Sequence, residues 1–367
     1  MTGIRLDASI GAIPTETVRA YAENARELAD RVSHLVFQHP KLAALLNGNP
    51  ARLLEVNHRN HAAFVAEILR TGNFPLLAKT LPWIYFTYHN QGVSFDYFPV
   101  ELSYWKQAIR ERLADADTQP LLALYDWMLA AHESSVAAAS DFRSPSPAVP
   151  EKLHATYARF VEALVACDHL TLLELSRGLL AQGASFPQLL QGLFFPAMVE
   201  IGVRWESGRL SVAGEHQATS TAYLVLSRLY SEQPFPAKPR GRAIVASVAG
   251  ELHELGAWMV AACLDLDGWE VTFLGADCDQ DTLIQAVVAE SPRFVALSIS
   301  MLSHLDEARA TIAALRAALG DQAETRILVG GQALLSVPSL VEALGADLFL
   351  TDCEAAVVWA RALDVSM

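Results

Sequence analysis

The sequence predicts a multidomain chain in which two all-helical regions precede a doubly wound α/β domain. Three observations carry this prediction. At 367 residues the chain exceeds the usual size of one domain, its apolar spacing is helical up to about residue 230, and short β-rich runs alternate with helix-length segments thereafter. Hydrophobic residues make up 52% of the chain, enough for several cores. We therefore expect domains at 1–142, 151–232 and 240–367, with a linker at 143–150.

The first region has the apolar spacing of amphipathic helices. Apolar residues recur at steps of three and four from Val18 to Leu35, and Pro14 before Thr15 is a typical helix start. The segment Asp141–Pro150 then holds three prolines and two serines. Because proline blocks the continuation of a helix and the segment has little apolar surface to bury, we expect a linker here.

The second region is again helical until the period changes. Its Ala- and Leu-rich stripes are interrupted at Gly183–Ser185 and Ser207–Gly208, and the proline cluster Pro234–Pro239 closes it. Five short β-rich runs follow, at 242–248, 269–274, 294–299, 326–329 and 347–350. Strands that alternate with helices favour a parallel sheet with right-handed crossovers, so we expect a five-stranded, doubly wound, Rossmann-like domain.

The charge and hydropathy of the chain argue against two kinds of partner. The formal net charge is −14 and no stretch is rich in lysine and arginine, so we expect no binding to nucleic acid, whose phosphates the chain would repel. Met1–Ile10 has no apolar core behind a basic flank, and apolar runs such as Phe294–Ile299 are too short to cross a bilayer. We expect a cytoplasmic protein that does not insert into membranes.

The four cysteines, Cys167, Cys263, Cys278 and Cys353, show no paired spacing. This spacing indicates neither a zinc site nor a disulfide framework. None of them precedes Cys167, so a chromophore in the first third of the chain could not be attached through a thioether.

The loop after the first predicted strand carries the most informative side chains, Glu251, His253 and Gly256. In a doubly wound sheet this loop lies at the carboxyl end of a strand, where ligands bind. An imidazole there can present one nitrogen to a metal while the nearby carboxylate accepts a hydrogen bond from the other, and Gly256 would let a bulky group approach the backbone. The alternative is a solvated loop histidine beside two glutamates.

Two further strand ends favour a ligand. The third predicted strand runs into Ser298, Ser300 and Leu302, and the fourth runs into Gly330 and Gly331. Side chains from three carboxyl strand ends would then converge on one ligand.

Together the three loops resemble the cobalamin-binding signature, which reads acidic-x-His-x-x-Gly, then Ser-x-Leu, then Gly-Gly. The resemblance implies base-off binding, in which His253 replaces dimethylbenzimidazole as the lower cobalt ligand and the nucleotide tail enters a slot in the α/β domain. It also implies that Ser300 contacts the buried base and that Gly330 and Gly331 leave room for the tail. Glu251 stands where the family usually has aspartate, and we expect a weaker or longer link to His253.

The second helical region resembles the four-helix cap that covers the other corrin face in methionine synthase and in cobalamin photoreceptors. Trp205 precedes Glu215 and His216 with the Trp, nine residues, Glu-His spacing of the light-responsive repressors of carotenoid genes. An indole can pack over an adenosyl group, and a carboxylate can accept hydrogen bonds from its ribose. The resemblance implies adenosylcobalamin, with Trp205, Val212 and Glu215 near the upper ligand and His216 as a cobalt ligand after illumination. Alone, Trp205 would be an ordinary core tryptophan.

The first region is rich in aromatic residues and histidines between Asn57 and Trp105. Each of them alone would be a core aromatic or an edge histidine, but as a group they predict a pocket for a flat conjugated ligand whose propionates Arg59 and Lys79 would serve. The candidate pocket residues are His58, Arg59, His61, Tyr85, Tyr88, His89 and Tyr97. Haem, with a histidine on iron in a globin-like fold, and a linear tetrapyrrole such as biliverdin both fit this chemistry.

A globin-like helical domain before a light-sensing B12 domain resembles the photocobilins, receptors that carry both B12 and biliverdin. The resemblance implies non-covalent biliverdin and a photoreceptor without catalytic residues. In it light cleaves the cobalt–carbon bond, moves the cap and changes a homo-oligomer, which we expect to be a dimer. A downstream partner is not indicated. The alternatives are a corrinoid methyl carrier, although no methyltransferase module is recognisable, and a light-independent sensor of B12 or haem.

Overall fold

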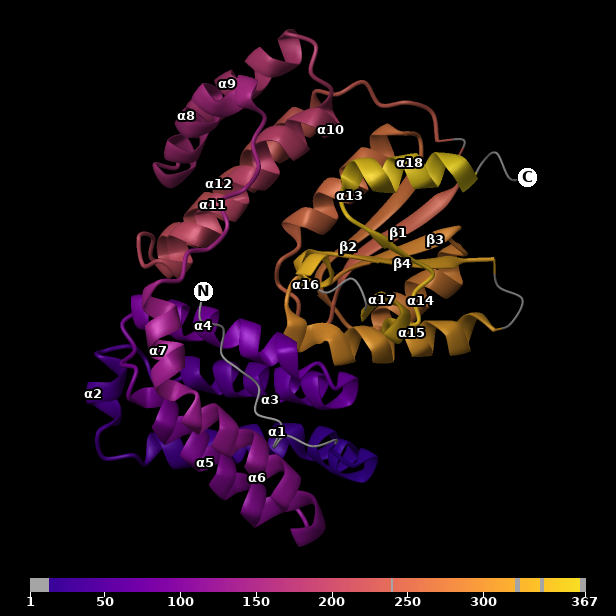
Figure 1. Ribbon diagram of the computed structural model, residues 1–367. Coiled ribbons are helices and arrows are strands. Elements are labelled where there is room, and N and C mark those ends of the chain that lie inside the picture. Colours follow the sequence, from indigo (N-terminus) through magenta and orange to yellow (C-terminus); the bar gives the residue numbers. More distant parts are fainter. Residues whose placement is uncertain (1–12, 239, 321–323, 337–339, 364–367) are drawn as a thin grey trace. The chain divides into compact units, whose positions relative to one another are not determined.

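The computed structural model describes residues 13–238, 240–320, 324–336 and 340–363 (Figure 1). Met1–Ile10, where we expect no secretory signal, lies outside the described residues. Pro239, the last proline of the cluster that closes the second helical region, also lies outside them. The contacts divide the chain into two compact units. One contains the residues up to Pro145 together with Val203–Ser211, and the other contains Ser146–Gly202 and the residues from Val212 onward.

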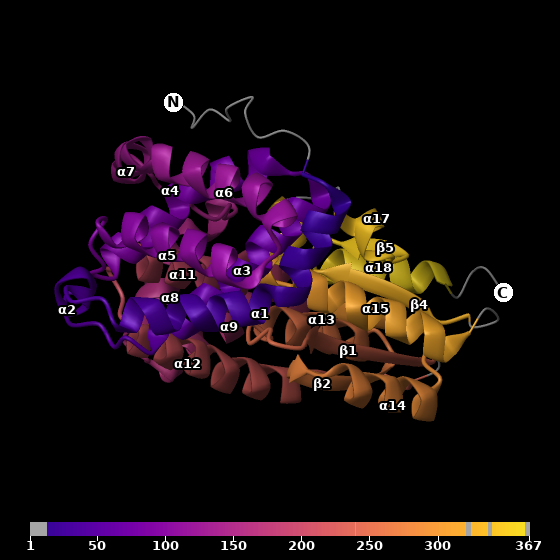
Figure 2. The same ribbon diagram turned by 90° about the horizontal axis from the view of Figure 1, so that it is seen from below.

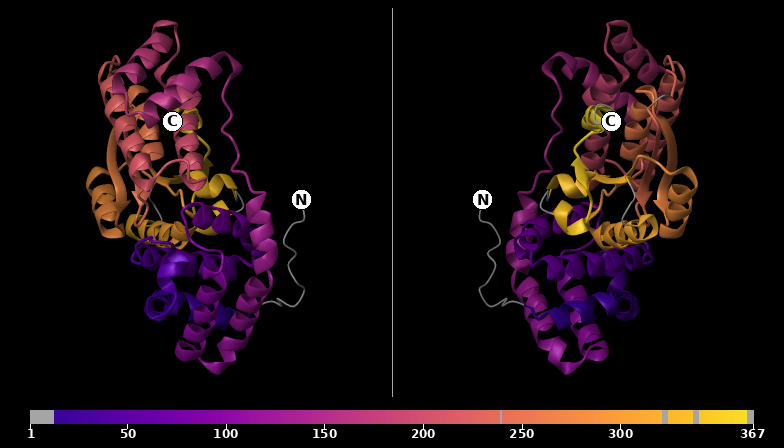
Figure 3. Two further views of the ribbon diagram at one scale, coloured as in Figure 1. Left: turned by 90° about the vertical axis from the view of Figure 1, so that its left-hand side faces the viewer. Right: turned by 90° about the vertical axis from the view of Figure 1, so that its right-hand side faces the viewer.

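The N-terminal unit is helical, which confirms that part of the prediction. Its helices are α1 (Thr15–Phe37), α2 (Leu42–Leu46), α3 (Leu53–Thr71), α4 (Phe74–Asn90), α5 (Tyr97–Arg112), α6 (Asp115–Ala130) and α7 (His132–Ser140). α1 packs along α3, α5 and α6, and α4 packs on α7; they are indigo to magenta in Figure 3. Tyr21, Leu28 and Val32 of α1 are fully buried, so the three- and four-residue spacing marks the core face of this helix.

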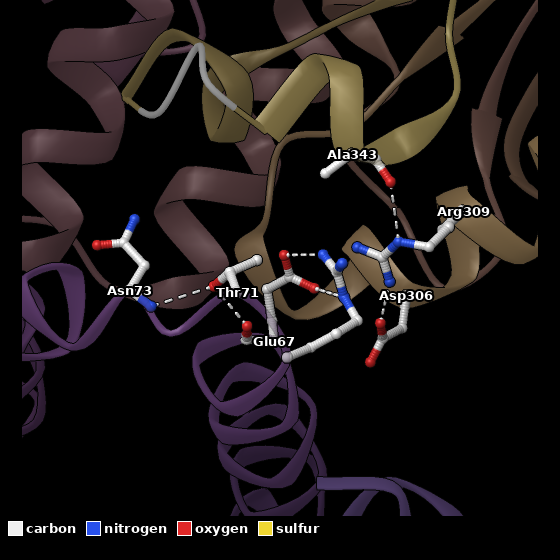
Figure 4. Close-up of polar contacts among 7 residues, drawn as sticks. Glu67, Thr71, Asn73, Asp306, Arg309 and Ala343 are labelled. Atoms are coloured by element: carbon white, nitrogen blue, oxygen red, sulfur yellow. Dashed lines mark hydrogen bonds and ion pairs between the residues drawn. The ribbon is translucent and has the colours of Figure 1, made fainter. Parts of the chain in front are cut away.

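The end of α3 shows how these helices are closed. Gly72 follows the helix with a φ of +64°, which glycine adopts without strain. The Thr71 hydroxyl donates to the Glu67 carbonyl at 2.7 Å, and the Asn73 N–H donates to the Thr71 hydroxyl at 3.4 Å (Figure 4). The Glu67 carboxylate is buried and pairs with Arg70 at 2.6 Å, so its charge is compensated within the same helix.

The second unit also begins with helices. They are η1 (Glu151–Leu153, a 3₁₀ turn), α8 (His154–Val165), α9 (His169–Ala181), α10 (Phe186–Leu189), η2 (Leu190–Phe194, a π-helical turn), α11 (Phe195–Glu206) and α12 (Val212–Ser231). The last residues of α11 belong to the other unit. α8, α9 and α12 pack on one another.

One helical stretch, Phe186–Glu206, is long and apolar enough to cross a membrane by length and composition alone. The expectation that every apolar run is too short missed this helix, because three helical segments join into one. Of its apolar window 44% is buried, and a single helix of this kind is weak support for a membrane span.

The rest of the second unit is a doubly wound α/β fold, which confirms the predicted five-stranded parallel sheet. Its strands are β1 (Arg242–Val248), β2 (Glu270–Cys278), β3 (Phe294–Ser298), β4 (Arg326–Gly330) and β5 (Leu348–Leu350), in the order β2-β1-β3-β4-β5. The helices are α13 (Leu255–Leu266), α14 (Gln280–Glu290), η3 (Leu302–His304), α15 (Leu305–Leu319), α16 (Gln332–Ser336), α17 (Leu340–Leu344) and α18 (Cys353–Leu363). Figures 1 and 2 show α13 and α18 on one face of the sheet and α14 and α15 on the other.

Strand β2 extends four residues beyond its predicted end at residue 274. Gly275 has a φ of +83°, and the register against β1 shifts on either side of Ala246, so the edge strand continues past an irregularity. In the sequence, the glycine and the aspartates that follow it resemble a turn, which is why the extension was not predicted.

Candidate functional site

The three strand ends that carry the predicted motif lie next to one another. β3 lies between β1 and β4 in the sheet, and Ser298 pairs with Ser247 on one side and with Gly330 on the other. The chain continues from β1 to β2 on one side and returns to β3 on the other side. The carboxyl ends of β1 and β3 therefore form the switch point at which doubly wound sheets bind ligands.

Glu251 organises this edge of the sheet. Its side chain is fully buried; Oε1 accepts hydrogen bonds from the backbone N–H and Nδ1 of His253 at 3.0 and 2.6 Å. Its Oε2 accepts from the backbone N–H groups of Ser300 and Met301 at 2.8 and 2.9 Å, and from Nδ1 of His304 at 3.0 Å. Burial acts to raise the pKa of Glu251, but the hydrogen bonds from His253 and His304 outweigh burial and hold the pKa below its usual range. The group is therefore a carboxylate.

His253 is held at one ring nitrogen and open at the other. A carboxylate only accepts hydrogen bonds, so Nδ1 carries the proton and Nε2 of the neutral ring keeps its lone pair. The side chain is 65% exposed, and among the described residues Nε2 has no partner. The hydrogen bond to Glu251 raises the pKa of His253, burial opposes this, and the negative charge of Glu215 raises it further. A free imidazole nitrogen supported by a buried carboxylate is suited to an axial metal ligand.

The structure corrects one expectation about this pair. The glutamate was expected to weaken or lengthen the link to His253, yet the Oε1–Nδ1 distance is 2.6 Å. The longer side chain of glutamate, compared with aspartate, also reaches the loop after β3, where Ser300, Met301 and His304 hold the second oxygen. His304 was not predicted, because a histidine at the start of a helix has no sequence feature that distinguishes it from a solvated one.

The remaining motif residues show two different environments. Gly331 has a φ of +108°, and a Cβ there would lie 2.3 Å from the carbonyl oxygen of Ile299, so the fold itself requires this glycine. A Cβ at Gly330 would lie 3.0 Å from the carbonyl of Leu350, whereas a Cβ at Gly256 would meet no atom within 4 Å. Gly256 therefore leaves space for a ligand, whereas Gly330 and Gly331 are packed closely against neighbouring backbone.

Unsatisfied hydroxyl groups at this edge fit a polar ligand. The hydroxyl oxygens of Ser247 and Ser303 are buried and have no hydrogen-bond partner among the described residues. Ser298, Ser300 and Leu302 are half-buried at the same strand end. Because buried polar groups normally find partners, these serines fit a bound group with polar atoms, such as a nucleotide tail.

The beginning of α12 carries three other predicted residues. Oε2 of Glu215 lies 2.6 Å from Nδ1 of His216, and Oε1 accepts from the Thr219 hydroxyl at 2.9 Å. The His216 side chain is 74% exposed and lines an open surface hollow of about 390 Å³ together with Cys167. Val212 is exposed. In this structure the His216 side chain is therefore exposed to solvent and hydrogen-bonded to Glu215.

Trp205 belongs to the N-terminal unit by its contacts. Its side chain is half-buried, and its carbonyl oxygen accepts a hydrogen bond from Nε2 of Gln91 at 2.5 Å. This hydrogen bond connects Trp205 to the end of α4.

Most of the candidate pocket residues of the N-terminal unit hydrogen-bond or stack with other side chains of this unit. Nδ1 of His58 lies 2.8 Å from the Ser33 hydroxyl, and Nε2 lies 2.8 Å from the Tyr97 hydroxyl, so both ring nitrogens are occupied. Nε2 of His61 lies 3.1 Å from the Tyr125 hydroxyl. Burial lowers the pKa of His58 to about 4 and, with the charge of His58, that of His61 to about 3. A haem iron bound by His58 would have to displace one of its two hydrogen bonds.

The other candidates divide between the core and the surface. Tyr85 stacks on Phe98 with ring centroids 3.8 Å apart, and burial raises the pKa of Tyr85 and Tyr88 well above the usual value. Arg59 is exposed and pairs with an aspartate at 3.4 Å, and His89 is exposed. The seven residues therefore do not all face one space in this structure.

The sequence interpretation missed Glu101, a buried carboxyl group in the same cluster. Burial raises its pKa to about 7, against the hydrogen bond that Nε1 of Trp105 donates at 3.2 Å. Its Oε1 lies 3.9 Å from Nε2 of His58. A single acidic residue in the apolar stripe of α5 was the available signal.

Two stretches match family profiles that are both described as a B12 binding domain, residues 156–230 and 241–358. The chain is 33% identical over 169 residues to the HTH-type transcriptional repressor CarA of Myxococcus xanthus, covering 46% of this chain and 55% of the repressor. It is 34% identical over 157 residues to the repressor CarH of the same organism, covering 42% and 50%. The chain spans about half the length of these two relatives.

Other similarities are to corrinoid proteins. Trimethylamine corrinoid protein 1 of Methanosarcina acetivorans is 24% identical over 196 residues, which are 52% of this chain and 89% of that protein. The structure of the monomethylamine corrinoid protein of Methanosarcina barkeri is similar over 57% of this chain and 99% of its own, with a TM-score of 0.49 and 19% identity. The matched stretches contain Glu215, His216, Glu251 and His253. The chain therefore carries a cobalamin-binding module in its C-terminal half.

Proposed function

We propose that this chain is a light sensor that binds adenosylcobalamin base-off, with His253 as the lower cobalt ligand, and that it is not an enzyme. Bound adenosylcobalamin supplies a cobalt–carbon bond that visible light breaks. The observation that carries the proposal is the buried Glu251 carboxylate, which fixes the His253 tautomer with Nε2 free. The Glu215–His216 pair on α12 adds a second ligand set of the light-responsive kind.

Each of the candidate site residues would have a separate role in holding the cofactor. Glu251 orients His253, while the half-buried Glu215 accepts hydrogen bonds from the ribose of the adenosyl group. Trp205 covers the adenine. His216, whose described hydrogen bond is to Glu215, would be the residue that holds the cobalt in the absence of the adenosyl group, and the start of α12 would shift with it.

We propose a change of self-association, from or to a homodimer, as the output. The net charge of −14 disfavours a DNA output, and a cytoplasmic location fits a sensor of this kind. A shift of the start of α12 would alter the surface around Val212, which is 47% exposed.

The test is reconstitution with adenosylcobalamin in the dark, followed by green light. We expect a changed absorption spectrum and a changed elution volume in size-exclusion chromatography. Hydroxocobalamin, which has no adenosyl group, serves as the control and should show neither change. An unaltered spectrum and size with adenosylcobalamin would refute the light-sensor proposal.

For the N-terminal unit we propose non-covalent biliverdin as a second ligand, with haem as the alternative. The aromatic cluster around Tyr85, together with the buried Glu101 carboxyl, provides walls and a polar group for a linear tetrapyrrole. No cysteine precedes Cys167, so a thioether link in this unit is not available. A red-shifted absorption band of bound biliverdin on titration supports biliverdin as the ligand. A Soret band on titration with haem, without any such band on titration with biliverdin, refutes biliverdin.

A corrinoid methyl carrier is the second candidate, favoured by the match to 89% of a trimethylamine corrinoid protein. A carrier needs an open upper face, whereas the proposed sensor retains an adenosyl group. Comparing the affinity for methylcobalamin with that for adenosylcobalamin in the dark distinguishes the two: a preference for methylcobalamin favours the carrier.

A further inference from the structure

The segment Val203–Ser211 belongs to the N-terminal unit by its contacts, although it interrupts the C-terminal unit in the sequence. The residues before it, up to Gly202, and those after it, from Val212, belong to the C-terminal unit. The segment itself packs with the N-terminal helices. It contains Trp205 and directly precedes the helix that carries Glu215 and His216.

Three contacts hold the segment in the N-terminal unit. Nε2 of Gln91 donates to the carbonyl oxygen of Trp205 at 2.5 Å, and the Ser144 hydroxyl donates to the Glu206 carboxylate at 2.5 Å. Gly208, with a φ of +69°, lies so close to α4 that a Cβ would be 2.6 Å from the carbonyl oxygen of Asn90. The end of α4 and the residues after α7 thus hold the segment from two sides.

Helix α4 connects this contact with the aromatic core of the N-terminal unit. Tyr85, one turn before the end of α4, stacks on Phe98 at 3.8 Å. The backbone of Gln91 is itself fixed, because its carbonyl accepts from Nδ2 of Asn49 at 2.9 Å. A displacement of α4 caused in the aromatic core would therefore be transmitted to the backbone at Trp205 through a single helix end.

We propose that Gln91 is a positioning residue for Trp205, so that the end of α4 sets the position of the indole that covers the adenosyl group. The inference rests on the proposed function, since it uses Trp205 as the cover of the adenosyl group. It extends that function, because the N-terminal helices then regulate how firmly the adenosyl group is held, with or without a bound chromophore.

Two substitutions in the full-length chain test the contact itself. Gln91→Glu keeps the size of the side chain but removes the N–H donor, and Gln91→Ala removes the side chain. We expect amide hydrogen exchange within residues 203–211 to become ~5-fold faster in both variants without cobalamin, as for the loss of one neutral hydrogen bond. Glu55→Gln, at an exposed position of α3, is the control and should leave the exchange unchanged. Unchanged exchange in both Gln91 variants overturns the proposal.

A second measurement tests the link to the upper ligand. In the dark, adenosylcobalamin should dissociate ~5-fold faster from the Gln91 variants than from the wild type, by the same loss of one hydrogen bond. Hydroxocobalamin should dissociate at the wild-type rate, because it has no adenosyl group for Trp205 to cover. Equal effects on both cobalamins, or on neither, overturn the role of Gln91. Failure of the light-sensor proposal is seen separately, as a wild-type protein that does not respond to green light.

Discussion

Replacement of Glu251 by glutamine inverts the hydrogen-bond pattern at the lower ligand. The carboxylate accepts at both oxygens, two donors at Oε1 and three at Oε2. An amide has one oxygen, and this oxygen will face the three donors, from Ser300, Met301 and His304. The amide NH₂ then faces His253, so Nδ1 must accept and Nε2 must carry the proton. A protonated Nε2 cannot bind cobalt.

The magnitude follows from the same contacts. The backbone N–H of His253 loses its acceptor, which costs about 1–3 kcal/mol, and the ring loses its favoured tautomer. Loss of an outer partner of a metal-binding histidine typically costs about 10–100-fold in affinity. We therefore expect Glu251→Gln to weaken His-on cobalamin binding ~10–100-fold, and His304→Ala, which removes one of three donors at Oε2, to weaken it less, since the His253 tautomer is retained.

Equilibrium dialysis gives the affinity, and electron paramagnetic resonance of the Co(II) form reports whether an axial nitrogen is bound. The Glu251→Gln protein should lose the nitrogen splitting, and the His304→Ala protein should keep it. A Glu251→Gln protein with wild-type affinity and an intact splitting would show that the carboxylate does not set the tautomer of His253.

Three other outcomes follow from the described contacts. Gly331→Ala should lower the free energy of unfolding in urea by about 2–4 kcal/mol, because its Cβ would lie 2.3 Å from a carbonyl oxygen at a φ of +108°; Gly256→Ala, with no atom within 4 Å, should change it little. Glu101→Gln should stabilise the protein more at pH 8 than at pH 5. The raised pKa of about 7 means that the folded state holds a proton that the unfolded state has released, so wild-type stability falls as the pH rises from about 4.5 to 7; equal effects at both pH values would contradict this. Tyr125→Phe should raise the pKa of His61 little, as measured by NMR titration, because burial is the main cause of its shift.

The α/β fold and the position of its site could be predicted because both depend on local patterns. β-rich runs spaced by helix-length segments allow few sheet topologies, and the topology places the ends of β1, β3 and β4 together. Glu251 and His253 are two residues apart, so their pairing is a local matter as well.

The partners that the sequence did not reveal are distant in the chain. His304 reaches Glu251 across 53 residues, and Gln91 reaches Trp205 across 114. The first contact depends on how the loops after β1 and β3 meet, and the second on how helices pack; periodicity specifies neither. The candidate pocket shows the same limit: composition marked the aromatic cluster, but it could not show that Tyr97 and His58 satisfy each other.

The two candidate cobalt ligands, His253 and His216, differ in how firmly hydrogen bonds hold them, and this difference indicates which of them can move. His253 donates two hydrogen bonds to a buried carboxylate that three other donors also hold, so movement of His253 would leave one oxygen of this buried carboxylate without its partners. His216 is 74% exposed, and its described hydrogen bond is to the adjacent residue Glu215, so its release costs little. Segments with few buried contacts open at low free energy. A change in the state of the cofactor should therefore leave the lower ligand in place and move the start of α12.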